Sequence, residues 1–312
     1  MPPRYPLPRH FFGGGGVFGI EKLSLAAALH LLIVVTVTLR VISQRLYPGT
    51  ALAWLVLVAS VPYGGAALYV LFGERPLGRA RMQRIRRLYP PERPWLGALA
   101  SSVAMGAATL SPRQQDLASL ATQALGAPAL GGARLTLLDG APAILQALAR
   151  DIDGARVSCH LEFYIWNAGG LADEVAEALQ RAARRGVDCR LLLDAVGSRP
   201  FLRGPWPARL RDSGVKLVAA LPVGFLRAAF VRMDLRLHRK IAVIDNRVAY
   251  TGSLNLVDPR YFKQGAGVGE WVDAMVRVEG SPVPAMDGVF QRDWVAEGGQ
   301  PAPTREAVLA EV

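Results

Sequence analysis

The stretch LHRKIAVIDNRVAYTGSLN, residues 237–255, constrains this chain more than any other part of the sequence. It fits the pattern H-x-K-x4-D-x6-G-S-x-N, which should arise by accident in roughly one of a hundred thousand chains of this length. The part from Leu237 to Ile244 is predicted to be a strand, on which His238 and Lys240 share a face. A turn at Asp245 and a second short strand should follow.

The residue types in this stretch suit attack on a phosphodiester. A lone histidine is usually an ordinary surface or core residue, but the complete pattern favours a nucleophilic His238, because a neutral imidazole can form a covalent phospho-enzyme. Lys240 and Asn255 are donors that could hold the non-bridging phosphate oxygens, and Ser253 could add another. Gly252 lets the backbone approach whatever His238 faces. This chemistry requires no metal or other cofactor, and no cluster of metal ligands is visible in the sequence.

Composition narrows the class of protein. The chain of 312 residues is 51% hydrophobic and carries a formal net charge of +11. The high apolar content calls for membrane segments or a large core. The positive charge suits an anionic partner, either nucleic acid or an acidic membrane surface. Cys159 and Cys189 lie in predicted strands, so we expect buried, reduced thiols in a cytosolic domain.

Two uncharged apolar runs near the start predict a transmembrane hairpin over residues 23–73, after a flexible tail at 1–22. The runs are 23–39 and 51–72, and the second would be about 33 Å long as a helix. Pro62 should kink it. The rival interpretation of the first run, a signal peptide, lacks a convincing cleavage site. Arginines concentrated after the second run place the C-terminal domain in the cytoplasm, and could also hold anionic headgroups.

The rest of the chain alternates predicted strands and helices. A basic juxtamembrane segment and linker should span 74–131, a globular lobe 132–300 and a C-terminal tail 301–312. Apart from the motif, the expected elements are a short helix within 112–132, strands at 157–166, 187–194, 215–219 and 272–278, helices at 171–185, 208–213 and 284–295, and a loop at 197–207. This order predicts a single α/β sandwich domain without an internal repeat.

Three polar features outside the motif allow more than one interpretation. His160 shares a strand face with Glu162 and Tyr164, and could supply a second acid or base, but it lacks the Lys and Asn companions of the motif. Asp194 ends a buried strand, which is more typical of a turn or cap than of catalysis. The basic, apolar segment 225–232 could lie on a membrane, cover the active site or form a plain loop.

The motif resembles the HKD signature of the phospholipase D superfamily. Residues 238–278 and 48–79 also resemble the first half of bacterial cardiolipin synthases, and the similarity runs from about residue 48 to 297. The resemblance implies a phospholipase D-like α/β sandwich lobe preceded by two transmembrane helices. It also implies a multi-pass protein of the bacterial inner membrane with its catalytic lobe in the cytoplasm.

The same resemblance assigns roles to the candidate site residues. His238 would be the nucleophile, and Lys240, Ser253 and Asn255 would surround the phosphate. Asp273 falls where the family places a carboxylate that orients the nucleophile. Asp245 belongs to the catalytic motif, with a role that is more structural. The implied reaction joins two phosphatidylglycerols into cardiolipin and glycerol through a phosphatidyl-histidine, without a metal or other cofactor.

One departure from the family pattern leaves alternatives open. Family members of this type carry two such motifs in one chain, and this sequence has one. The second catalytic histidine would then come from a homodimer partner or from a separately encoded second lobe, or the chain would be a truncated, inactive fragment. A membrane-tethered, single-motif phosphodiesterase or nuclease acting as a dimer is a different possibility, as is a non-catalytic membrane protein. The predicted hairpin argues against nucleic acid as the partner.

Overall fold

The structure is a computed structural model that describes residues 16–44, 47–61, 63–73, 83–84, 86, 110–125, 129–222, 236–263, 265, 267 and 269–300. These residues belong to two compact units, one within the first 76 residues and one that begins at Leu77. The expected tails at 1–15 and 301–312, most of the arginine-rich stretch and the segment 225–232 lie outside the described residues.

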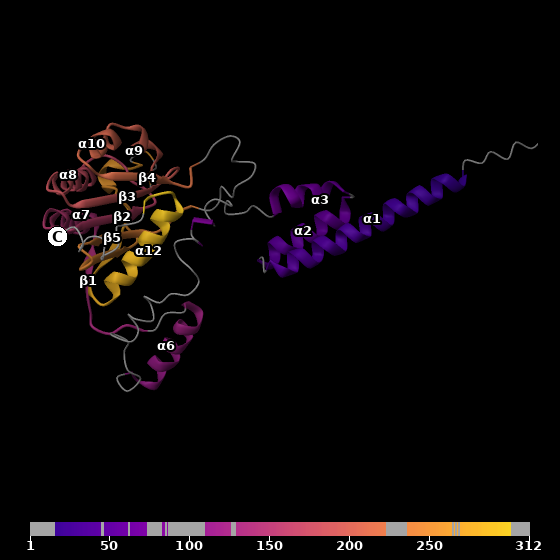
Figure 1. Cartoon of the computed structure of the whole chain (residues 1–312), viewed down its shortest axis with the longest axis horizontal. Coiled ribbons are helices and arrows are strands. Elements are labelled where there is room, and N and C mark those ends of the chain that lie inside the picture. Colours follow the sequence, from indigo (N-terminus) through magenta and orange to yellow (C-terminus); the bar gives the residue numbers. More distant parts are fainter. Residues whose placement is uncertain are drawn as a thin grey trace, which may run out of the picture. The chain divides into compact units, whose positions relative to one another are not determined.

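The first unit is built from the two apolar runs. Its elements, seen in Figure 1, are α1 (Gly16–Ser43), α2 (Pro48–Ser60), α3 (Gly64–Leu68) and the π-helical turn η1 (Tyr69–Gly73). Helix α1 begins within the expected tail, and the second run breaks between α2 and α3, where the sequence predicts a kink. A Cβ at Gly65 would lie 2.6 Å from the carbonyl oxygen of Leu57, so only glycine allows α3 to approach α2 this closely.

A small apolar cluster joins the helices of this unit. Val37 and Val41 of α1 pack with Val58 of α2 and with Tyr69, and all four are buried. Ile33, Val34, Ala51, Trp54 and Leu55 pack against this cluster and are partly buried, whereas many other apolar side chains of the unit are exposed. Large ones with more than two-fifths of their surface exposed include Leu29, Leu31, Leu32, Val35, Leu39, Leu52 and Val56. Over the part of the chain that the structure describes, no helix has both the length and the apolar character needed to cross a membrane.

The second unit is an α/β lobe around a mixed sheet of seven strands in the order β1-β7-β6-β5-β2-β3-β4 (Figure 1). Strands β2, β3 and β4 are parallel to one another, and the other neighbours pair antiparallel. The strands are β1 (Ala133–Asp139), β2 (Ser158–Phe163), β3 (Asp188–Asp194), β4 (Lys216–Ala220), β5 (Lys240–Ile244), β6 (Val248–Gly252) and β7 (Ala274–Gly280). The predicted α/β class is therefore confirmed.

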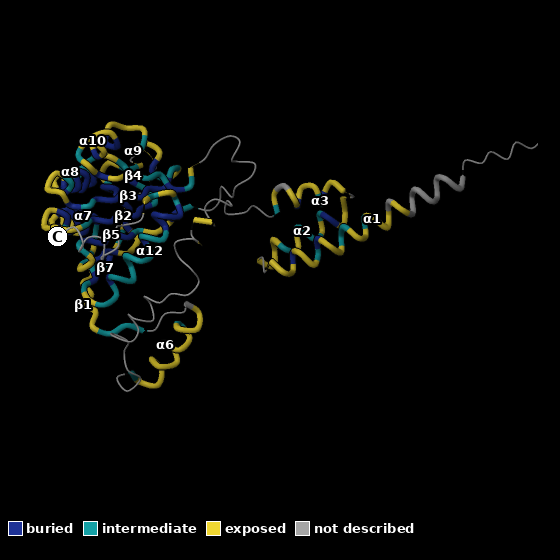
Figure 2. The backbone as a smooth tube through the Cα atoms, viewed as in Figure 1, coloured by how far each residue is buried: buried dark blue, intermediate teal, exposed yellow. Residues whose placement is uncertain are grey.

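Helices cover both faces of the sheet. The lobe contains α6 (Pro112–Leu125), α7 (Ala141–Asp153), α8 (Leu171–Arg184), α9 (Arg199–Arg203), α10 (Trp206–Asp212), the 3-10 turn η3 (Pro259–Tyr261) and α12 (Pro282–Ala296). Helices α7, α8 and α10 share one apolar core with the sheet, and α12 packs on the opposite face (Figures 1 and 2). Helix α9 lies in the segment expected to be a loop, and β1 and α7 were not expected as elements.

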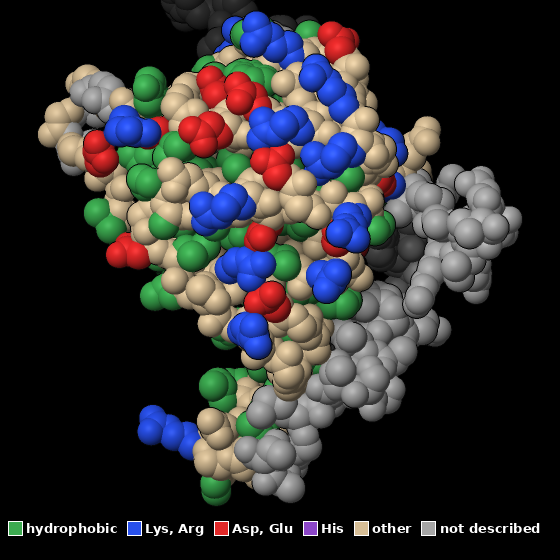
Figure 3. Space-filling view, turned by 90° about the vertical axis from the view of Figure 1, so that its left-hand side faces the viewer, with side chains coloured by type: hydrophobic (Ala, Val, Ile, Leu, Met, Phe, Trp, Pro, Cys, Tyr) green, Lys and Arg blue, Asp and Glu red, His purple; other side chains and the backbone are tan. Residues whose placement is uncertain are grey.

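The core and the surface of the lobe agree with the composition. Cys159 and Cys189 are free thiols, fully buried and opposite each other on β2 and β3, as expected. On the face shown in Figure 3, Lys and Arg side chains lie scattered among Asp and Glu. The described residues of that face therefore mix both signs of charge, although the whole chain is strongly basic.

Candidate active site

His238 lies just before strand β5, and Lys240 is the first residue of that strand. The pairing of β5 with β2 begins at Lys240, opposite Phe163, so the predicted strand over Leu237–Ile244 starts three residues late. Side-chain contacts hold the preceding backbone instead. The amide of Leu237 donates to Asp194 Oδ2 at 3.0 Å, and Lys240 Nζ donates to the carbonyl of His238 at 2.8 Å. The imidazole of His238 remains exposed on the surface of the lobe.

Tyr164 brings the two central motif residues together. The ring of His238 meets its ring edge-on, with centroids 4.5 Å apart, and Lys240 Nζ lies 5.9 Å from the same ring. Gly197 makes room for this tyrosine, because a Cβ there would lie 2.7 Å from the ring. Sequence reasoning placed Tyr164 on a face with His160 and gave it no role. An aromatic residue at the end of a central strand was the only available signal.

The turn after β6 supplies the next motif residues. Ser253 is exposed and exchanges hydrogen bonds with the backbone of Ala274: its amide donates at 2.9 Å and its Oγ accepts at 3.1 Å. Asn255 is 7% exposed, and its Oδ1 accepts from the amide of Ile165 at 3.1 Å. Because the side-chain oxygen is engaged in this way, the NH2 group of Asn255 is the part of the side chain that can donate to another group. A Cβ at Gly252 would lie 2.3 Å from the carbonyl oxygen of Ala274, so the backbone that it admits belongs to β7.

Asp273 acts electrostatically on Lys240. Burial lowers the pKa of the Lys240 ammonium, and the negative charge of Asp273 opposes that shift. Asp273 Oδ2 is itself buried, without a hydrogen-bond partner among the described residues. Its predicted contact with the imidazole of His238 is not among the hydrogen bonds of the described part of the chain. The orienting role of Asp273 therefore stays a prediction.

Asp245 lies at the other end of β5, away from this group. Its carboxylate accepts from three successive backbone amides at the start of β2, those of Arg156 at 2.9 Å, Val157 at 2.7 Å and Ser158 at 2.9 Å. The residue has a positive φ of 51°, as the turn requires. These contacts support the structural interpretation of Asp245 and separate it from the other motif residues.

Asp194 is fully buried and acts as a cap, as the sequence predicts. Its Oδ1 accepts from the amides of Val196 and Gly197, both at 2.9 Å. Its Oδ2 accepts from Leu237 and lies 3.3 Å from Arg236 Nε. One carboxylate thus fixes both the turn after β3, which supports Tyr164, and the chain that leads into His238.

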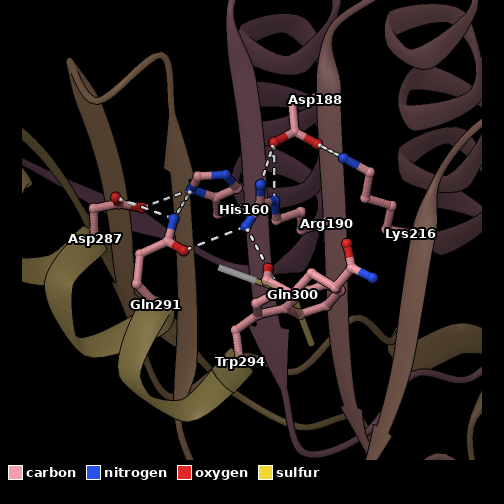
Figure 4. Close-up of polar contacts among 8 residues, drawn as sticks. All are labelled: His160, Asp188, Arg190, Lys216, Asp287, Gln291, Trp294 and Gln300. Atoms are coloured by element: carbon pink, nitrogen blue, oxygen red, sulfur yellow. Dashed lines mark hydrogen bonds and ion pairs between the residues drawn. The ribbon is translucent and has the colours of Figure 1, made fainter. Parts of the chain in front are cut away.

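His160 belongs to a separate polar network beneath α12 (Figure 4). Its Nδ1 lies 2.6 Å from Asp287 Oδ1 and 3.2 Å from Gln291 Nε2, and its ring stacks on Phe290 with centroids 4.9 Å apart. Arg190 extends the network through Gln291 and Asp188. Since His160 pairs with Val243, three residues along β5 from Lys240, it joins the helix to the sheet and is not part of the motif group.

The described residues contain no cluster of His, Cys, Asp and Glu able to hold a metal ion. What the motif group offers instead is an exposed imidazole, an ammonium, an amide and a hydroxyl on neighbouring chain segments. A nucleophile beside several hydrogen-bond donors can attack a phosphodiester and stabilise the charge that develops on its oxygens.

Comparisons with known proteins agree with this chemistry. Residues 148–294 match the family described as "Cardiolipin synthase, PLD-like domain". The chain is 46% identical over 281 residues to cardiolipin synthase A of Erwinia tasmaniensis, which covers 89% of this chain and 58% of that protein. It is 45% identical to cardiolipin synthase A of Klebsiella pneumoniae, with 86% and 55% covered. The chain therefore spans somewhat more than half the length of these relatives.

Among solved structures, the lobe is similar to Nuc, a phospholipase D family member from Salmonella typhimurium. The TM-score is 0.40 and the sequence identity 19%, and the match covers 55% of this chain and all of that one.

Proposed function

We propose a function from the premise that this chain is a homologue of bacterial cardiolipin synthase A and carries a phospholipase D-like domain of that family. The chain is a phosphatidyltransferase that joins two phosphatidylglycerols into cardiolipin and releases glycerol. The observation that carries the proposal is an identity of 45–46% over 86–89% of the chain, which includes the complete motif.

The first step forms a covalent intermediate on His238. A neutral imidazole nitrogen attacks the phosphorus of one phosphatidylglycerol, the new P–N bond forms, and the bond from phosphorus to the glycerol oxygen breaks. In the second step, a hydroxyl of another phosphatidylglycerol attacks the phosphatidyl-histidine and displaces the imidazole. Lys240, Ser253 and Asn255 donate to the phosphate oxygens in both steps, where negative charge develops in the transition states.

The reaction also needs a proton donor for the departing glycerol and a base for the attacking hydroxyl. His238 cannot fill these roles while it is bonded to phosphorus. Asp287 and Gln291 engage His160 beneath α12, which makes it a poor substitute. A second HKD lobe would supply the missing histidine, either from a homodimer partner or from a separate chain.

The first unit would seat the enzyme in the bacterial inner membrane. Its helices expose many large apolar side chains, as expected for a surface that faces lipid. The arginine-rich stretch that follows would keep the lobe in the cytoplasm. A reporter fused after Val312 should be active in the cytoplasm, and activity confined to the periplasm would contradict this topology.

The test of function uses the purified full chain with vesicles of phosphatidylglycerol, and mass spectrometry to detect cardiolipin and glycerol. Wild-type protein should form both when a second motif is present. His238→Ala and Lys240→Ala should each be inactive with the same second lobe. Robust activity from a proven monomer would overturn the requirement for that lobe, and cleavage of single-stranded DNA in place of lipid transfer would overturn the proposed function.

A further inference from the structure

We infer that Arg239, the residue between the two central motif residues, positions the His238 imidazole, and that the buried carboxylate of Asp293 holds Arg239 for this task. The inference rests on the proposed nucleophilic role of His238. It concerns residues that neither the motif nor the relatives' names assign to the site.

The need for such an anchor comes from the end of the β-ladder. Lys240 is the first residue of β5 that pairs with β2, so His238 and Arg239 lie just outside this ladder. The backbone amide of Leu237 is held from one side by Asp194. The carbonyl of His238 accepts from the partly exposed Lys240, which the phosphate would also engage. Without a second buried anchor, His238 could therefore swing about this point, and its ring contact with Tyr164 would be lost.

Arg239 provides the second anchor by reaching the face of the sheet that α12 covers. Its Nη1 forms an ion pair with Asp293 of α12 and lies 3.7 Å from Glu162 Oε1 of β2. Asp293 is 5% exposed and Glu162 is fully buried, whereas the Arg239 side chain is 43% exposed. Because an unpaired buried carboxylate is costly, Asp293 strongly favours the position of Arg239 that neutralises it.

A second carboxyl group, that of Glu162, lies beside the ion pair of Arg239 and Asp293. Both of its carboxyl oxygens are buried and lack a hydrogen-bond partner among the residues described. Burial, and then the negative charge of Asp293, raise the pKa of Glu162 to about 9, although the positive charge of Arg239 opposes the shift. Glu162 is therefore protonated and uncharged at neutral pH. Its distance of 3.7 Å from Arg239 Nη1 is consistent with a neutral carboxyl group. Asp293 alone supplies the charge that holds Arg239.

A high-pH consequence follows from this arrangement. The charged groups that face Glu162 are Arg239, together with Asp293 and Arg292 of α12, whose Nε lies 3.8 Å from Asp293. When Glu162 loses its proton near pH 9, a second negative charge competes with Asp293 for Arg239. The guanidinium should then shift toward Glu162, and the backbone of His238 should move with it.

Misplacing the nucleophile should lower kcat more than it raises KM, because the phosphate-binding donors stay in place. We expect Arg239→Met and Asp293→Asn to lower kcat about 10- to 100-fold with KM within about twofold. Arg239→Lys should restore part of the loss. Glu162→Gln should keep the neutral-pH rate and shift the alkaline limb of the kcat profile, since glutamine cannot ionise.

The matched control is Asp151→Asn. Asp151 forms a 2.7 Å ion pair with Arg277 in which both side chains are partly buried, but this pair lies with Tyr250 on the α7 side of the sheet. Its removal should cost stability and leave kcat unchanged at temperatures where the protein is folded. Equal kcat values for Arg239→Met and Asp151→Asn, or an unchanged alkaline limb in Glu162→Gln, would overturn the inference.

A second readout does not depend on activity. Diethyl pyrocarbonate modifies accessible imidazoles, and peptide mass spectrometry of the full-length protein gives the rate at His238. Arg239→Met and Asp293→Asn should change this rate at least about twofold, as expected for a ring that leaves Tyr164, with circular dichroism unchanged. If wild-type protein fails to transfer lipid, the proposed function fails; if the rate at His238 stays constant in folded variants, the positioning role fails.

Discussion

The two ends of strand β5 carry residues of the same motif, but these residues differ in exposure and in how many hydrogen bonds they make within the protein. At one end, His238 is exposed, Lys240 is partly desolvated and Asp273 Oδ2 has no hydrogen-bond partner among the described residues. At the other end, three backbone amides saturate the carboxylate of Asp245. Polar side chains at the first end are therefore free to contact a substrate, whereas the carboxylate at the second end is used in hydrogen bonds that hold the fold together.

This difference shows that one spacing pattern can encode two tasks. Asp245 joins the β5–β6 turn to the start of β2, which fixes the register of the strand that delivers Lys240 opposite Phe163. We therefore expect a residue at this end to affect function only through the geometry of the strand. Substitutions at the two ends should therefore differ in whether they lower activity, stability or both.

The largest effect should come from Lys240→Ala. Loss of a charged donor to the phosphate oxygens should lower kcat about 100- to 1000-fold. The folded state should be little affected, because the Nζ of Lys240 donates only to the carbonyl of His238 among the described residues. Kinetics with phosphatidylglycerol vesicles and thermal unfolding measure the two quantities. A large loss of stability in this variant would show that Lys240 also has a structural role, and would contradict the proposed difference between the two ends of β5.

Tyr164→Ala should have the next largest effect. Removing the ring frees the imidazole of His238 and the Lys240 side chain, so we expect kcat to fall about tenfold. Tyr164→Phe serves as the control, since it keeps both ring contacts. Equal activity of the alanine and phenylalanine variants in steady-state assays would show that the ring does not organise the site.

Asp245→Ala should act on stability instead. Three backbone amides lose a charged acceptor, two of them at exposed residues and one at a partly buried residue, which should lower the free energy of unfolding by roughly 1–3 kcal/mol. The rate per folded molecule should stay within about twofold of wild type when it is measured well below the midpoint of unfolding. A hundredfold loss of kcat in folded Asp245→Ala protein would give this residue a catalytic role after all.

The smallest effect is a change in the pH dependence of stability. The pKa of Glu162 is raised from an ordinary 4.5 to about 9 by folding, so the native state binds more protons than the unfolded chain between these values. Its contribution is fully present below pH 4.5 and is lost as pH rises toward 9. Glu162→Gln should therefore flatten the stability profile over this range in denaturant titrations. A profile parallel to that of wild type would contradict the raised pKa.

Local patterns in the sequence predicted much of the fold and part of the site. The apolar stripe of α8, the turn after β5 and the capping role of Asp194 follow from periodicity and turn chemistry, and all three are confirmed. The contacts that the sequence did not reveal join distant segments. Tyr164 meets His238 from the segment directly after β2, and Arg239 meets Asp293, which is 54 residues away in the sequence.

Other differences have local causes. His238 precedes β5 because Asp194, and not a neighbouring strand, takes the amide of Leu237. The short helix α9 forms where proline and glycine suggested a loop, since buried Phe201 stacks on Trp166 and ties the segment to the core. Tertiary packing decided both cases, and it cannot be read from a single strand or turn pattern.

The most direct test of the account is the covalent intermediate. The full chain is mixed with vesicles of phosphatidylglycerol and a second lobe that keeps its motif histidine, quenched rapidly, and digested for mass spectrometry. The account predicts a phosphatidyl group on the imidazole of His238 and none in His238→Ala protein treated in the same way. An adduct on another residue, or cardiolipin formation by the folded His238→Ala chain, would contradict it.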